Sequence, residues 1–183
     1  MSQFSFPLKD KLELSEAMQI AFERSLKRRG EAKLISAMGH SPDLFDWYID
    51  DFYKKLFYSG SAPVIYKELG RLRLSEVHGC RSCNKGNRLD ADAAGLSSAK
   101  IASVYNADSP VFDAADKAVI QLADLMSLHA LRGRLSESLY DALRVHFDDG
   151  QILELSLVFS FLAGMAHFMF AFDMVEREDS CQL

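Results

Sequence analysis

The residues with the clearest capacity for chemistry are two cysteines three positions apart, Cys80 and Cys83. Gly79, just before them, can take the positive φ of a tight turn between two helices. If a helix begins at Cys80, free backbone N–H groups and the helix dipole favour a thiolate in its first turn. Both sulfurs then share a face and can close a disulfide with little backbone movement. The spacing predicts reversible thiol chemistry, supported by the nearby positive charge of Arg81 and Lys85.

Two other interpretations of the pair are open. With His78, the cysteines could form part of a zinc site, but structural zinc uses four ligands and the remaining cysteine, Cys181, lies in a polar tail. The pair could also be inert and buried. Its neighbours are polar, which is typical of exposed, reactive thiols; they are Arg81, Ser82, Asn84 and Lys85. We therefore predict redox chemistry without a metal or cofactor, and we expect Cys181 to be a free thiol with no role.

The sequence around the pair resembles a known family. From Glu68 to Cys83 it reads E-L-x-x-L-R-x-S-x-x-x-G-C-x-x-C, and residues 37–44 read A-M-G-H-S-P-D-L. The first pattern resembles the signature of the alkylhydroperoxidase D and carboxymuconolactone decarboxylase superfamily, and the second resembles the preceding segment of its peroxidase-related members. The resemblance extends from about His40 to Asp173.

The resemblance implies an all-α protein, a compact multi-helix domain that assembles into trimers or hexamers through apolar helices. It implies a cysteine pair that cycles between dithiol and disulfide while reducing a peroxide. In that family, the acid matching Glu68 and a histidine four residues after the second cysteine carry protons. Here that position is Asn87, which cannot gain and lose a proton near neutral pH. We therefore expect weak peroxidase activity, or a proton carrier elsewhere in the chain.

Two histidines are candidates for that carrier, His78 and His167, the second from the same or a neighbouring subunit. Each has a simpler interpretation. His78 stands beside a helix-ending glycine and can act as a C-cap, and His167 can be a hydrogen-bonded core residue. Glu68 can likewise be an ordinary surface acid, since most carboxylates are exposed.

Composition indicates one ordinary globular domain. The chain has 183 residues, half of them hydrophobic, and a net charge of −5. We predict a single domain over residues 1–183, with its core at about 40–175 and a polar tail at 176–183. The negative charge gives no reason to expect nucleic acid or an anionic membrane as partner. Because the first residues lack a basic segment followed by an apolar one, we expect a cytoplasmic protein.

Apolar spacing and capping residues predict helices throughout, with no strand-like alternation. The basic run 27–29 is expected to be a solvated helix end. Aromatic residues near Tyr48 recur at helical spacing and are expected to pack against a core or subunit. The helices are expected at about 15–29, 42–58, 63–78, 80–94, 96–106, 113–131, 136–146 and 152–175.

The last of these segments has no formal charge from Leu155 to Phe172, which is long enough to ask about a membrane span. A stripe of small and polar residues interrupts it, and so we predict a buried helix with no membrane partner. Ser156, Ser160 and Gly164 follow a four-residue step, which lets another helix approach closely. Such a helix suits the centre of an oligomer.

Three functions are compatible with these features. The first is a thiol-dependent peroxidase whose partners are a small peroxide and a dithiol or protein reductant. The second is a lyase acting on a small carboxylated lactone, in which Arg73 and Arg88 would clamp the carboxylate. The third is a redox sensor whose disulfide forms without turnover. The retained cysteine pair favours the first.

Overall fold

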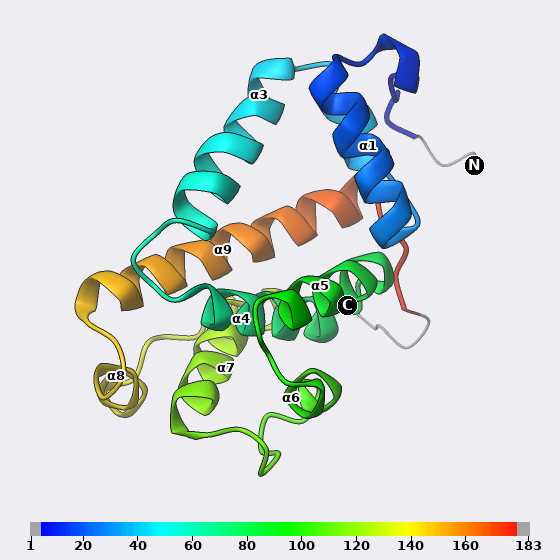
Figure 1. Ribbon diagram of the computed structural model, residues 1–183. Coiled ribbons are helices and arrows are strands. Elements are labelled where there is room, and N and C mark those ends of the chain that lie inside the picture. The colour runs from blue at the N-terminus through cyan, green and yellow to red at the C-terminus, as the bar shows by residue number, and fades with distance from the viewer. Residues whose placement is uncertain (1–4, 179–183) are drawn as a thin grey trace.

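The computed structural model describes residues 5–178 (Figure 1). Within this range the regular elements are helices, with one isolated antiparallel bridge between Cys80 and Arg177. The predicted all-α class is confirmed. Cys181, predicted to be a free thiol, lies outside the described residues.

The chain order places the cysteine pair between α4 and α5, near the middle of the sequence. The element η2 is a π-helix that continues α3 directly, and η1 and η3 are short 3₁₀ helices. The elements are η1 Lys11–Glu13, α1 Glu16–Arg29, α2 Lys33–Met38, α3 Pro42–Asp46, η2 Trp47–Phe57, α4 Val64–Val77, α5 Arg81–Ala93, α6 Ser98–Ser103, α7 Ala114–Met126, η3 Leu128–Ala130, α8 Glu137–Arg144 and α9 Asp149–Ala171.

Two predicted helices were wrong at their ends. The helix expected to reach Leu131 stops at Met126, because Ser127 is extended and the Leu128 N–H donates to Nε2 of His78 at 3.1 Å. The last helix begins earlier than expected, at Asp149, where Asp148 and Gln151 form a capping box. It also ends earlier, at Ala171.

The core is built around α4, which packs against α5, α7 and α9 (Figure 1). Its residues Leu69 and Leu72 are fully buried. Gly70 allows α9 to come close, since a Cβ there would lie 2.0 Å from the ring of Phe159. This contact brings the backbone of α4 against α9, so the two helices form a closely packed layer.

Helix α1 and the continuous helix formed by α3 and η2 lie on one side of this layer. Figure 1 shows α1 and the α3–η2 rod on one side of α9, with α4 and α5 below them. Phe45 and Phe52 are buried, which agrees with their helical spacing in the sequence. Their burial holds the continuous α3–η2 helix against the rest of the chain.

One side of α9 is not covered. In length and composition α9 resembles a membrane-spanning helix, but the core helices of soluble proteins can have the same length and composition. Within the chain, 33% of its most apolar stretch is buried. Leu153, Leu157 and Gly164 are exposed. The Ser156 and Ser160 hydroxyls donate to carbonyls one turn earlier in the same helix. Assembly through this face stays a prediction.

Gly70→Ala tests the packing of α4 on α9. Although Ala favours a helix by about 1 kcal/mol over Gly, the new methyl group meets the Phe159 ring, and overpacking of this kind costs about 1–3 kcal/mol. We expect a net loss of stability in urea-induced unfolding. The matched control is Gly164→Ala in α9, where a Cβ meets no described atom of the same chain within 4 Å. Because Gly164 lies on the face predicted to assemble, size-exclusion chromatography must first show that both variants keep the wild-type oligomeric state. Equal effects of the two substitutions would contradict the close approach.

Candidate active site

The turn before α5 positions the cysteine pair. Gly79 has φ +62°, the left-handed conformation expected for it. Cys80 is the N-cap of α5, and its Sγ accepts a hydrogen bond from the Cys83 N–H at 3.4 Å. It therefore precedes the first turn, one residue earlier than predicted. The Glu178 N–H donates to the Gly79 carbonyl at 2.7 Å, so the C-terminal segment holds the turn in place.

Cys80 and Cys83 are joined as a disulfide, with their Cα atoms 5.2 Å apart. Their environments differ. Cys80 is 1% exposed and Cys83 is half-buried. The Ser82 hydroxyl oxygen lies 4.0 Å from the Cys80 Sγ. Cys83 is thus the sulfur that a substrate reaches more easily, and Cys80 lies behind it.

Both cysteines line a cavity of about 590 Å³ between α1, η2, α4, α5 and α9. Its wall on α9 is apolar and includes Leu162, Met165 and Met169. Its polar groups come from the other elements, and they include Arg28, Arg29, Glu31, Tyr48, Tyr53, Tyr58, Arg71, Ser82, Asn87 and Asp90. A cavity with an apolar wall on one side and polar groups on the other, next to a sulfur pair, is typical of a small-molecule site.

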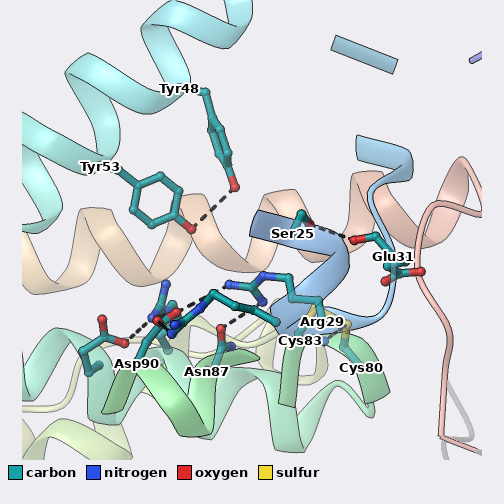
Figure 2. A network of polar contacts seen from close by, with 12 residues as sticks. Ser25, Arg29, Glu31, Tyr48, Tyr53, Cys80, Cys83, Asn87 and Asp90 are labelled. Atoms are coloured by element: carbon teal, nitrogen blue, oxygen red, sulfur yellow. Dashed lines mark hydrogen bonds and ion pairs between the residues drawn. A yellow bond between two sulfur atoms is a disulfide. The ribbon is translucent and has the colours of Figure 1, made fainter. Parts of the chain in front are cut away.

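A buried ion-pair network lies beside the pair. Nη2 of Arg71 is 2.5 Å from Oε2 of Glu68 and 2.8 Å from Oδ2 of Asp90. Arg28 and Arg29 also form ion pairs with Asp90, as Figure 2 shows in part. The prediction that the basic run 27–29 is solvated was therefore wrong at these two arginines. Because Asp90 lies on the facing helix, it draws them into the cavity wall.

Glu68 is 1% exposed, so it is not an ordinary surface acid. Burial raises the pKa of its carboxyl, while the Arg71 charge acts in the opposite direction. Its contact with the cavity runs through Arg71, which lines the wall. The direct proton transfer predicted for Glu68 stays a prediction.

Asn87 is buried in the cavity wall, where its Oδ1 accepts a hydrogen bond from Arg29 at 3.3 Å. Figure 2 shows this side chain between the cysteine pair and Asp90. The amide therefore holds an arginine next to the sulfurs, which does not need a titrating group. This contact is compatible with an orienting role for Asn87.

A row of tyrosines faces the cavity from η2. In an α-helix, residues five apart point in different directions, at 3.6 residues per turn. In the π-helix the hydrogen bond runs from residue i+5 to residue i, as from the Tyr58 N–H to the Tyr53 carbonyl at 2.9 Å. Tyr48, Tyr53 and Tyr58 therefore lie on one face, and the first two hydroxyls are 3.5 Å apart (Figure 2). Burial raises the pKa of Tyr48.

His78 lies at the end of α4 and is 1% exposed. Its Nε2 accepts the Leu128 N–H, a role that needs the neutral ring. Burial, with a smaller contribution from the charge of His129, lowers the pKa of His78 to about 4. A ring that stays neutral is a poor proton acceptor for the sulfurs, although it lines the same cavity.

Three further candidates lie elsewhere. His167 is exposed on α9 and does not line the cavity, so its predicted role would require a neighbouring subunit and stays a prediction. Arg73 binds Asp124 and two carbonyls, and Arg88 forms an ion pair with Glu76. Neither arginine lines the cavity, so the predicted carboxylate clamp was wrong for this chain. In the described part of the chain, no group of three or more His, Cys, Asp or Glu side chains is arranged to hold a metal ion.

Glu31 is among the cavity residues that were not predicted from the sequence. Glu31 follows the helix-ending Gly30, and its side chain lines the cavity together with both cysteines. Its Oε1 is buried and finds no hydrogen-bond partner among residues 5–178. No spacing rule connects it with Cys80, because the two meet only through the packing of α1 on α5.

Searches against protein-family models and against curated proteins gave no match. Solved structures do match. A peroxidase-related protein with an alkylhydroperoxidase D core from Ralstonia eutropha is 14% identical, with a TM-score of 0.72 over 95% of this chain and 92% of that one. An uncharacterised peroxidase-related protein from Silicibacter is 16% identical, with a TM-score of 0.74 over 96% and 91%.

A cysteine-to-alanine variant of the debrominase Bmp8, in complex with 2,3,4-tribromopyrrole, is also similar. It is 17% identical, with a TM-score of 0.69 over 98% of this chain and 94% of that one. The chain thus has the all-α alkylhydroperoxidase D-like fold, shared by peroxidase-related proteins and this debrominase. At these identities the likeness concerns the fold, and it confirms the resemblance seen in the sequence at that level.

The lowered pKa of His78 predicts acid sensitivity. Its pKa is about 4 in the folded chain and 6.5 when unfolded, so between these values the unfolded state binds the extra proton. Stability from this group is complete above pH 6.5 and is lost as the pH falls toward 4, by about 3 kcal/mol at about 1.4 kcal/mol per pKa unit. Urea unfolding across pH 4–7 measures how the free energy of unfolding changes with pH. His78→Gln should remove the part of this pH dependence that comes from His78.

The matched control is His129→Gln, which removes the weaker of the two causes and should keep most of the slope. A slope in His78→Gln as steep as in the wild type would contradict the assignment.

Proposed function

We propose that the protein is a thiol-dependent peroxidase that works through the Cys80–Cys83 pair. The observation that carries the proposal is a disulfide joining these cysteines inside a cavity large enough for a small organic molecule. Support comes from the fold, which is shared with peroxidase-related proteins. A dithiol gives up two electrons when it closes, as the reduction of one peroxide requires.

The more exposed sulfur is the better candidate for the reaction with peroxide. The Cys83 thiolate attacks one peroxide oxygen, the O–O bond breaks, and the leaving oxygen takes a proton to become an alcohol or water. Cys83 is then a sulfenic acid. Cys80 attacks this sulfur, and the S–O bond breaks to release water. A dithiol or protein reductant restores both thiols.

Each neighbouring group has a place in this cycle. The N-terminus of α5 and the cationic side chains of Arg29 and Arg71 favour a thiolate at the pair. Glu68 holds Arg71 in the wall, and Asn87 holds Arg29. We further propose that the protein works in the cytoplasm as a homo-oligomer, a trimer or hexamer, built on the uncovered face of α9.

A second candidate function, reductive dehalogenation, would use the same two electrons of the Cys80–Cys83 dithiol. The tyrosine row gives the cavity a flat aromatic side, and the similar structure of the debrominase Bmp8 contains a bromopyrrole. A halogenated aromatic ring could accept the two electrons of the dithiol, releasing halide and taking up a proton. Assays of peroxide loss and of bromide release from 2,3,4-tribromopyrrole separate the two substrates.

Titration of free thiols distinguishes the peroxidase from the redox sensor and from the lactone lyase. After peroxide is added to the reduced protein, loss of two thiols with turnover supports the peroxidase. Loss without turnover supports the redox sensor. Thiols that remain unchanged favour the lactone lyase, although Arg73 and Arg88 are bound elsewhere.

Serine substitutions test the assignment of the two sulfurs. We expect Cys83→Ser to abolish peroxide consumption, because the accessible nucleophile is gone. Cys80→Ser should still consume about one equivalent and then stop as a sulfenic acid, since no second thiol closes the disulfide. Mass spectrometry after trapping the sulfenic acid with dimedone measures both. The reverse pattern would assign the peroxide reaction to Cys80.

Asn87→His tests the missing proton carrier. A histidine here places a titrating imidazole in the wall near the pair, and we expect steady-state peroxide turnover to rise about 10-fold, below the usual ~10²–10⁴-fold contribution of general acid–base catalysis because Arg29 loses its amide partner. The control is Asn87→Gln, which enlarges the side chain without a titrating group. Turnover that is unchanged, or that rises equally in both variants, counts against the explanation.

A further inference from the structure

The loop between α1 and α2 holds Glu31 above the cysteine pair. Gly30 has φ +86° and ends α1, which turns the next residue back toward the cavity. The Ser25 hydroxyl donates to the Glu31 backbone carbonyl at 2.8 Å and fixes this turn. In Figure 2 the Glu31 side chain extends from the loop toward α5, where the cysteines lie.

Ser82 connects the carboxyl group with sulfur. Among the groups that lower the pKa of Glu31 and so stabilise its charged form, the Ser82 hydroxyl has the largest effect, through a side-chain hydrogen bond. The same hydroxyl lies 4.0 Å from the Cys80 Sγ, and Ser82 is 6% exposed. A hydroxyl both donates and accepts, so it can take a proton from one neighbour while giving one to the other. Glu31, Ser82 and Cys80 therefore form a continuous path that begins at a half-buried carboxyl and ends at a buried sulfur.

The charges around Glu31 suit proton exchange. Burial raises the pKa of the Glu31 carboxyl, and the charge of Glu176 acts in the same direction. The Ser82 hydrogen bond and the charges of Lys33 and Arg29 oppose this, but the net direction is upward. Lys85 adds a further positive charge, with its Nζ 3.8 Å from where a Cβ on Gly30 would lie.

We propose that Glu31 exchanges the proton of Cys80 through Ser82 as the disulfide closes and opens. On closing, Cys80 gives its proton to Ser82, and Ser82 passes its own to the Glu31 carboxylate. The S–S bond forms while the S–O bond of the Cys83 sulfenic acid breaks, and the departing hydroxide takes a proton from Glu31 to leave as water, which restores the Glu31 carboxylate. On reduction, a donor thiolate attacks Cys83, and Cys80 leaves as a thiolate and takes a proton back by the same path.

This assignment rests on the proposed function for its place in a peroxide cycle, although the path itself concerns only thiol exchange. It gives the chain a proton carrier where position 87 holds an amide. Glu31 acts through Ser82 and touches no substrate. It is therefore a positioning residue, and its replacement should change how the rate of disulfide closure depends on pH.

Thiol exchange without peroxide tests the path in the full-length protein. Reduced protein is mixed with oxidised glutathione, which reacts at Cys83, and closure by Cys80 is followed by stopped flow from pH 5.5 to 9.5. We expect Glu31→Gln to slow closure about 10-fold near pH 6.5, below the usual ~10²–10⁴-fold contribution of general acid–base catalysis because the proton passes through Ser82. At pH 9.5, where hydroxide is abundant enough to remove the thiol proton without a side-chain base, its rate should equal that of the wild type.

Two variants and one control complete the design. Ser82→Ala should show the same loss near pH 6.5, and the double variant should be no slower than either single one, since both interrupt one path. Glu23→Gln, an exposed acid on α1, should behave as the wild type. Circular dichroism melts of each variant confirm that the fold is intact.

The path is overturned by a Glu31→Gln profile parallel to that of the wild type, whether equally fast or equally slowed at every pH. A normal rate in Ser82→Ala, or additive losses in the double variant, also overturns it. A peroxide assay on the same samples separates the two proposals. If the wild type does not turn over peroxide but Glu31→Gln slows thiol exchange only at low pH, the peroxidase is refuted and the path is supported. If the wild type turns over peroxide but Glu31→Gln exchanges thiols normally at every pH, the peroxidase is supported and the path is refuted.

Discussion

The buried charge of Arg71 sets the geometry around it. Removing a guanidinium from water costs several kcal/mol, and it is tolerated only where counter-charges meet it. Glu68 and Asp90 supply these, and the ring of Phe57 lies 5.0 Å below the guanidinium carbon. Asp90 also binds two arginines of α1. Since α1, α4 and α5 can satisfy these groups only together, the network fixes three walls of the cavity at once.

The same network explains what the site can bind. Its arginines give the wall beside the sulfurs a positive character, which favours a thiolate. Arg71 is nevertheless engaged by carboxylates on two sides, and Asn87 and Asp90 hold Arg29. A carboxylated substrate would have to displace one of these contacts. A neutral substrate meets no such competition, and the apolar wall of α9 offers it a surface.

The sequence predicted what local spacing determines. The motif from Glu68 to Cys83 spans the end of α4, the turn at Gly79 and the first turn of α5, so its geometry followed from the helical repeat and from Gly79. Contacts between distant segments left no such trace. Nothing near Met126 indicates that the Leu128 N–H would bind His78, and the α-helical repeat used for Tyr48 cannot reveal a π-helix. Arg28 looked solvated because its partner, Asp90, lies far away in the sequence.

The position of the proton carrier is the least local property of the site. An α-helix presents residues 83 and 87 on one face, so a histidine at 87 would be the simplest neighbour for the sulfurs. With Asn87 holding Arg29 and His78 kept neutral by burial, α4 and α5 offer Glu68, whose carboxylate is bound to Arg71. Glu31 lies in the cavity wall with both cysteines, and its Oε1 is buried without a hydrogen-bond partner among the described residues. Burial raises the pKa of the half-buried Glu31 carboxyl above its ordinary value, which supports the proton exchange proposed for it beside a thiol pair that has no histidine at position 87.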